Sequence, residues 1–232
     1  FTPIIFFKIL LNFFKKEISI LGAFVFCVFP IIVFSASQIS SVTIYIFLFL
    51  TFVLLFLQFA NKPSNFLSVS IGLISGILIL TRRDFILIYF FSLLYFLIFL
   101  RVDLKKIITM IFVFVITISP YLIRNYISFE RIILHSGFGY NVWKAYNPKA
   151  DVEGFYVEEE ELKLKINKVE KNIFYRINED KIYLNEAKKY IMEEPFRYFK
   201  LFLKRIYSFY FFDFNSTQKN YYNLFHIAPN TI

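Results

Sequence analysis

Arg82-Arg83-Asp84 is the part of this sequence whose residue types are best suited to bind a charged ligand. The triplet separates two apolar runs, so it places three charges at the end of a segment that is otherwise apolar. Adjacent guanidinium groups donate forked hydrogen bonds that match the oxygens of a phosphate. The triplet is therefore a candidate site for a lipid phosphate. The alternative is that both arginines are interfacial anchors and that Asp84 pairs with one of them.

The other residue types that could do chemistry form no recognisable pattern. Cys27 is the single cysteine and lies within an apolar run, which leaves no disulfide framework and no metal-binding spacing. His135 and His226 have no obvious carboxylate partner in the sequence, and a lone histidine in a loop usually contacts water. The sequence also lacks a P-loop and a nucleophile elbow. We therefore identify no cofactor, and the need for a divalent metal stays open.

Five apolar runs surround the arginine triplet and must position it. Each approaches the length of about 20 residues that a bilayer requires, and the runs are 18–34, 39–60, 66–80, 84–100 and 107–123. With 58% hydrophobic residues in the whole chain, this pattern predicts an all-α polytopic membrane protein with about five transmembrane helices. Because 66–80 and 84–100 are short, an alternative is one bent pair that meets near the membrane edge.

Basic residues between the apolar runs predict the orientation in the membrane. If all five runs cross, seven Lys and Arg residues lie on one side and three on the other, namely Lys8, Lys15, Lys16, Lys62, Arg101, Lys105 and Lys106 against Arg82, Arg83 and Arg124. The positive-inside rule makes the first side cytoplasmic. The arginine triplet and everything after Arg124 are then external. The pI near 9.4 reflects these topology charges, and we expect no nucleic-acid partner.

Residues 130–232 differ from residues 1–129 in composition. The first part carries three acids against ten Lys and Arg, whereas the second carries fourteen acids against sixteen. We therefore expect a transmembrane helical region over 1–129 and a mainly helical external domain over 130–232. The charge pattern after residue 158 predicts one helix, and the segment 180–194 predicts a second. Pro195 can be the first residue of a third helix, which leads into 196–212. The last helix is aromatic and basic, which predicts that it lies along the membrane surface.

Both ends of the sequence indicate a longer protein. The sequence begins at Phe1 without an initiator methionine or a signal peptide, and it stops at Ile232 just after an expected return toward the membrane. We therefore expect a fragment whose external domain is truncated at the C-terminus.

Two further segments make the sequence resemble a known superfamily. Ser119–Tyr126 closes the fifth apolar run with Pro, aromatic, Arg and Asn residues, and Gly137–Pro148 has the pattern of a loop with glycines, aromatics and Asn-Pro. In this order they resemble the bacterial GT-C glycosyltransferases, relatives of the protein O-mannosyltransferases and of the aminoarabinose transferase that modifies lipid A. Weaker similarities extend the resemblance over most of 29–225: Phe29-Pro30 with Ser35–Gln38, Gly72–Arg82, Ala187–Ile191, and Pro195 with Phe199–Arg205.

The resemblance implies a function at the external face of the membrane. Such an enzyme lies in the bacterial inner membrane and transfers a hexose or pentose from a polyprenyl-phosphate donor to an acceptor. Its catalytic Asp takes a proton from the acceptor, which attacks C1 of the sugar with inversion. That Asp would lie upstream of Phe1, so the resemblance assigns no catalytic residue within this sequence. The identities of the sugar and the acceptor are not implied.

The resemblance also implies which residues bind the substrate. Cationic groups would meet the growing charge of the phosphate leaving group, and the candidates are Arg82, Arg83 and Arg124, with Asp84 beside them. The residues that would shape the external pocket are Asn125, Asn141, Trp143, Tyr146 and Asn147. Trp143 could stack on a sugar, although a tryptophan in the interfacial belt is the more common explanation. Asn147-Pro148 fits a simple turn equally well.

The sequence departs from the family pattern at two of these places. Arg83 stands where the family has Pro, and Val42 stands where many relatives have Glu. Two other functions also stay open. A transporter or flippase for lipid-linked saccharide would require ionisable or broken-helix features near the middle of the membrane. A non-catalytic membrane scaffold would use its external domain only to bind partners.

Overall fold

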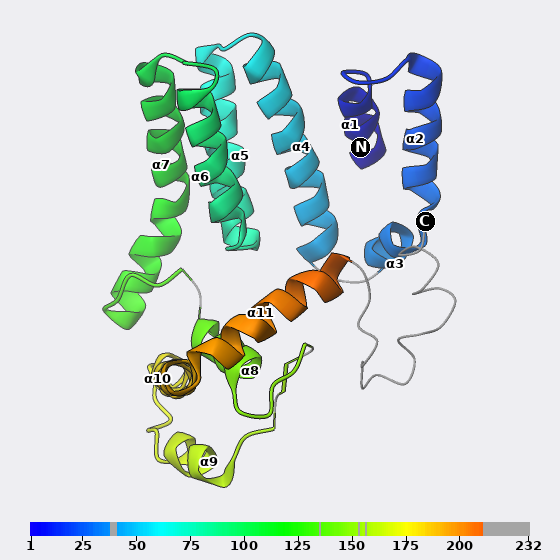
Figure 1. Ribbon diagram of the computed structural model, residues 1–232. Coiled ribbons are helices and arrows are strands. Elements are labelled where there is room, and N and C mark those ends of the chain that lie inside the picture. Colours follow the sequence, from blue (N-terminus) through cyan, green and yellow to red (C-terminus); the bar gives the residue numbers. More distant parts are fainter. Residues whose placement is uncertain (38–40, 135, 153, 156, 211–232) are drawn as a thin grey trace. The chain divides into compact units, whose positions relative to one another are not determined.

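The computed structural model describes residues 1–37, 41–134, 136–152, 154–155 and 157–210 (Figure 1). All regular secondary structure in these residues is α-helical, which confirms the all-α class. The chain forms two compact units, Phe1–Leu134 and His135–Ile232. Residues 38, 135, 211, 212 and 226, which appear in the sequence analysis, lie outside the described residues.

Three short helices precede the long ones in the first unit. They are α1 (Thr2–Leu10), α2 (Lys16–Val28) and α3 (Pro30–Ser37). The expected single span over 18–34 is therefore wrong, because the run breaks at Phe29, whose ψ of 120° is extended. The ring of Pro30 causes this break, since a residue that precedes proline is driven out of the helical region. Helix α1 was not expected from the sequence.

The next four helices correspond to the other four apolar runs. They are α4 (Ser41–Asn61), α5 (Asn65–Thr81), α6 (Phe85–Ile98) and α7 (Leu104–Phe129). Among the described residues, α4 and α7 are long and apolar enough to cross a membrane, whereas α5 and α6 are apolar but shorter. Five transmembrane helices are therefore not confirmed. Which side of a membrane each end would face stays a prediction.

Helices α5 and α7 pack closely because α5 carries glycines on the contact face. A Cβ atom on Gly72 would lie 2.6 Å from the carbonyl oxygen of Met110, and one on Gly76 would lie 2.6 Å from Cβ of Thr117. These two contacts run in the same direction along both helices, so α5 and α7 are parallel (Figure 1). The core around them is fully buried and includes Phe59, Ile71, Leu78, Phe85, Phe96 and Met110.

The described residues of the second unit form α8 (Phe138–Tyr146), α9 (Glu160–Asn167), α10 (Tyr175–Glu193) and α11 (Pro195–Tyr210). The expected loop over 137–148 is wrong, because most of it is α8. Helix α10 begins five residues before the expected start at 180. Pro195 is the first residue of α11, as expected, since a missing N–H costs nothing at that position.

Two small cores join the described helices of the second unit. The first contains Trp143, Leu162, Ile166, Tyr183 and Ala187, and so joins α8, α9 and α10. The second contains Ala150, Tyr198 and Leu201 and fixes one face of α11. Other α11 side chains are exposed and apolar, including Phe196, Phe199, Leu203 and Ile206. That these side chains rest on a membrane surface stays a prediction.

Candidate functional site

The arginine triplet lies in the turn between α5 and α6. Arg82 is the C-terminal cap of α5, and Asp84 immediately precedes the first residue of α6. Arg82 Nη2 lies 3.1 Å from Asp84 Oδ2, and the Arg82 guanidinium carbon lies 5.4 Å from the centre of the Tyr45 ring in α4. These two contacts hold the Arg82 side chain in place. Because the side chain is still 51% exposed, part of the guanidinium stays open to a ligand. Arg83 is half-buried.

Arg124 lies at the same end of the bundle as this triplet. Successive helices from α4 to α7 run in opposite directions, so α5 and α7 are parallel and both end at the end of the bundle where α4 and α6 begin (Figure 1). The register set by Gly72 and Gly76 brings the end of α5 level with residues 121–124 of α7. The Arg124 side chain is exposed. The three candidate arginines thus lie at the same end of the first unit.

Asn125 has a structural role, which contradicts its assignment to a substrate pocket. It is 3% exposed, and its Nδ2 donates to the carbonyl oxygen of Ile133 at 2.6 Å. Its Oδ1 accepts a hydrogen bond of 3.2 Å from Arg124 Nη1. Helix α7 continues to Phe129, beyond the expected end of the run at 123, so Asn125 lies inside this helix. Its amide thus joins α7 to the segment that follows the helix.

The candidates in 137–148 do not form one site. Trp143 is 1% exposed in the core between α8 and α10, so neither sugar stacking nor an interfacial position is correct. Tyr146 is half-buried, with its ring 5.8 Å from that of Tyr198 and 5.2 Å from the Arg205 guanidinium carbon. Asn141 is exposed. Of these residues, only Asn141 presents its side chain openly to solvent.

Asn147 ends helix α8 and joins it to the following segment. Its Nδ2 donates to the carbonyl oxygens of Trp143 at 3.2 Å and Phe155 at 2.7 Å, and its Oδ1 accepts from the backbone N–H of Lys149 at 3.0 Å. The residue is 3% exposed. The turn interpretation is therefore correct, and substrate binding by this side chain is not.

Replacing Asn147 with alanine should destabilise the second unit by about 2 kcal/mol, because buried carbonyl groups would lose their donor. Chemical unfolding monitored by the fluorescence of Trp143, the single tryptophan, measures the change. Asn141→Ala on the exposed side of α8 is the matched control and should leave the midpoint nearly unchanged. Equal effects of both substitutions would contradict the structural role of Asn147.

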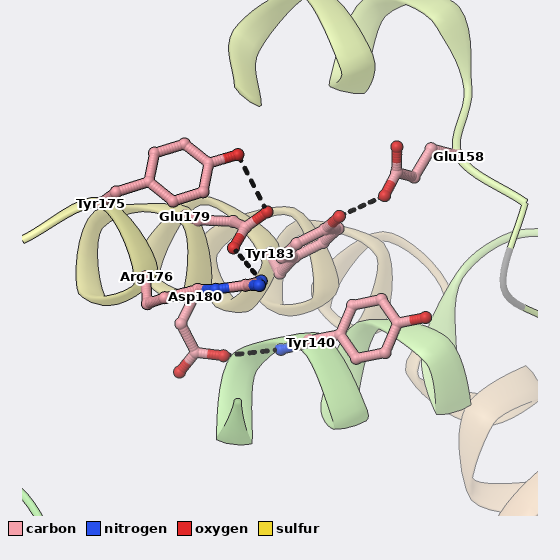
Figure 2. A network of polar contacts seen from close by, with 7 residues as sticks. All are labelled: Tyr140, Glu158, Tyr175, Arg176, Glu179, Asp180 and Tyr183. Carbon is pink, nitrogen blue, oxygen red and sulfur yellow. Dashed lines mark hydrogen bonds and ion pairs between the residues drawn. The ribbon is translucent and has the colours of Figure 1, made fainter. Parts of the chain in front are cut away.

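A pocket of about 430 Å³ in the second unit, with charged residues and tyrosines in its wall, was not expected from the sequence. Its walls come from the start of α8, the segment before α9 and the first half of α10 (Figure 2). The residues that line it are Ser136, Gly137, Tyr140, Glu158, Arg176, Glu179, Asp180 and Tyr183. In the sequence, the spacing of these residues resembles that of solvated helix faces. No local pattern marks them as a group.

Hydrogen bonds and an ion pair fix the acids of this pocket, as Figure 2 shows. The Tyr183 hydroxyl donates to Glu158 Oε1, and Asp180 Oδ1 accepts from the backbone N–H of Tyr140 at 2.9 Å. Glu179 accepts from the Tyr175 hydroxyl at 3.3 Å and pairs with Arg176 at 3.2 Å. The three carboxylates are therefore held in defined positions.

The local field of the pocket is negative. Burial raises the pKa of the Tyr183 phenol, and the carboxylates of Glu158 and Glu179 raise it further. Tyr183 is therefore a neutral hydrogen-bond donor at physiological pH. No group of three or more His, Cys, Asp or Glu residues in the described part of the chain is arranged to hold a metal ion. The pocket thus presents oxygen acceptors and aromatic rings.

The comparisons with known proteins found no match for this chain, whether to a protein-family model, to a curated protein or to a solved structure. The resemblance to the GT-C glycosyltransferases therefore stays a prediction from the residues that carry it.

Proposed function

We propose that this chain forms the lipid-donor site of an integral membrane glycosyltransferase that uses a sugar linked to a polyprenyl phosphate. The observation that carries the proposal is that Arg82, Arg83 and Arg124 lie at the same end of an otherwise apolar bundle. Arginine side chains at the end of an apolar bundle can reach the membrane interface, where lipid phosphates lie. A lipid phosphate is the anion that a bilayer presents at this depth.

The chemistry of the transfer makes these cations useful. An acceptor hydroxyl forms a bond to C1 of the sugar while the bond from C1 to the phosphate oxygen breaks and polyprenyl phosphate leaves. Negative charge grows on that phosphate in the transition state, and guanidinium groups fixed beside it lower the barrier. Arg82 is suited to this role because Asp84 and the Tyr45 ring hold it in place. The general base is assigned to none of the described residues.

Substitution of Arg82 or Arg124 by glutamine should weaken phosphate binding. We expect the Kd for geranylgeranyl phosphate, measured with the full chain in phosphatidylcholine nanodiscs, to rise about tenfold for each variant, which corresponds to about 1.4 kcal/mol. Arg82→Lys should give an intermediate loss, because lysine cannot donate a forked pair of hydrogen bonds. The thermal midpoint should change little.

Lys62→Gln is the matched control for the arginine variants, because Lys62 follows α4 at the opposite end of the bundle. It should leave the Kd unchanged. An unchanged Kd in the arginine variants would contradict the proposal and would indicate that these residues are interfacial anchors. Release of free polyprenyl phosphate from a lipid-linked sugar in the presence of an acceptor distinguishes a transferase from a flippase, which moves the intact lipid.

A further inference from the structure

The pocket of the second unit has the dimensions of a small-molecule site and has no part in the proposed lipid-donor site. Its volume of about 430 Å³ lies within the range of known ligand pockets, roughly 300 to 1,000 Å³. The segments that enclose it are fixed by the core of Trp143, Leu162 and Tyr183 beneath them. The cavity is therefore a built feature of the unit.

The charge of the pocket selects the sign of its ligand. Among the described residues, three carboxylates and one guanidinium line it. The Arg176 side chain is 78% exposed and already pairs with Glu179, so water and this partner screen its charge. An anionic ligand would face Glu158 and Asp180 without compensation. A cationic ligand would be attracted to both.

Two carboxylate oxygens are available to such a ligand. Glu158 uses Oε1 to accept from Tyr183, and Asp180 uses Oδ1 to accept from Tyr140. Within the described part of the chain, no hydrogen bond or ion pair engages Glu158 Oε2 or Asp180 Oδ2. Because the first oxygens hold both carboxylates in place, an ammonium group can bind at either second oxygen without the cost of ordering that side chain.

Aromatic rings complete the wall of the pocket. The ring centres of Tyr140 and Tyr183 lie 5.1 Å apart at an angle of 77°. The face of a tyrosine ring attracts a cation through its quadrupole, and the same face covers the aliphatic part of a ligand. The wall is thus suited to an ammonium group that is attached to a hydrocarbon chain.

We propose that this pocket binds a small organic cation, an ammonium group on an aliphatic stem, between Glu158 and Asp180 and against the rings of Tyr140 and Tyr183. This proposal does not rest on the lipid-donor site. The two can therefore fail or succeed separately.

Trp143 provides a direct readout of binding, because it is the single tryptophan and its ring centre lies 5.2 Å from that of Tyr183 and 6.0 Å from that of Tyr140. Cadaverine is the probe, added to the full chain in a nonionic detergent, and pentane-1,5-diol is the uncharged control of equal length. We expect a saturable change in fluorescence with the diamine alone, and a matching heat by calorimetry. No signal by either method, or an equal response to the diol, overturns the proposal.

Isosteric variants test the two carboxylates. Glu158→Gln and Asp180→Asn keep an oxygen that can accept from Tyr183 or Tyr140, so each should fold, and each should weaken cadaverine binding about tenfold. Arg176→Gln should tighten binding severalfold, a gain that misfolding cannot produce. Glu193→Gln removes an exposed acid outside the pocket and should leave the Kd unchanged. An equal loss in Glu193→Gln, or an unchanged Kd in both pocket variants, overturns the assignment.

Discussion

Replacing Gly139 with alanine should unfold the second unit or destabilise it by about 3 kcal/mol or more. A Cβ atom at this position would lie 1.9 Å from the carbonyl oxygen of Asp180 and 2.9 Å from its carbonyl carbon. Both are backbone atoms of α10, so no side chain can move aside and the two helices must separate. The expected sign is notable because alanine normally stabilises a helix relative to glycine by about 1 kcal/mol.

Chemical unfolding monitored by Trp143 fluorescence measures this effect, since Trp143 lies in the core that α8 and α10 share. Asn141→Ala, two positions along α8 on an exposed site, controls for the change in helix propensity. A Gly139→Ala variant as stable as the parent would show that α8 does not approach α10 as closely as the structure has it.

Replacing Gly72 with alanine should destabilise the first unit by about 2 kcal/mol. The new Cβ would lie 2.6 Å from the carbonyl oxygen of Met110 and 2.9 Å from Cβ of Val113. Val113 is β-branched and Met110 contributes its backbone, so neither can yield without moving α7 away from α5. A thermal midpoint measured by circular dichroism in detergent should fall by several degrees.

Gly22 provides a matched control for Gly72. A Cβ on Gly22 would also come within 2.6 Å of another atom, but that atom is Cδ1 of Leu10, the flexible end of a side chain. Leu10 can change rotamer at small cost, so Gly22→Ala should be close to neutral. If both alanine variants lower the midpoint equally, the cost comes from helix propensity or the detergent and not from the backbone contact in the bundle.

The sequence predicted four of the helices in the first unit because length and hydrophobicity are local properties. The runs that correspond to α4 and α7 are apolar along their whole length, and charged or turn-forming residues flank each run. Pro30 was visible in the first run, and its effect on Phe29 could have been inferred from the same local chemistry. Hydrophobicity does not by itself make α5 and α6 membrane spans, since both helices are apolar but shorter than a full span.

Helix α8 could not be predicted in the same way. Two glycines, two asparagines and a following proline favour a loop over 137–148. The helix forms because Trp143 is buried against α10 and because only glycine fits at position 139. Tertiary packing therefore overrode a weak local preference. The same packing buries Trp143 and Asn147, which the sequence had suggested as ligand contacts.

The sequence by itself determined the helical class, the apolar helices and the arginines between α5 and α6, because each depends on residues that are adjacent in the chain. The tertiary structure alone decided which side chains meet. Glu158 reaches Tyr183, and Tyr140 reaches Asp180, across separations of 25 and 40 residues. A carboxylate on a solvated helix and one that lines a pocket have the same local pattern, and only the packing of α8 against α10 distinguishes them.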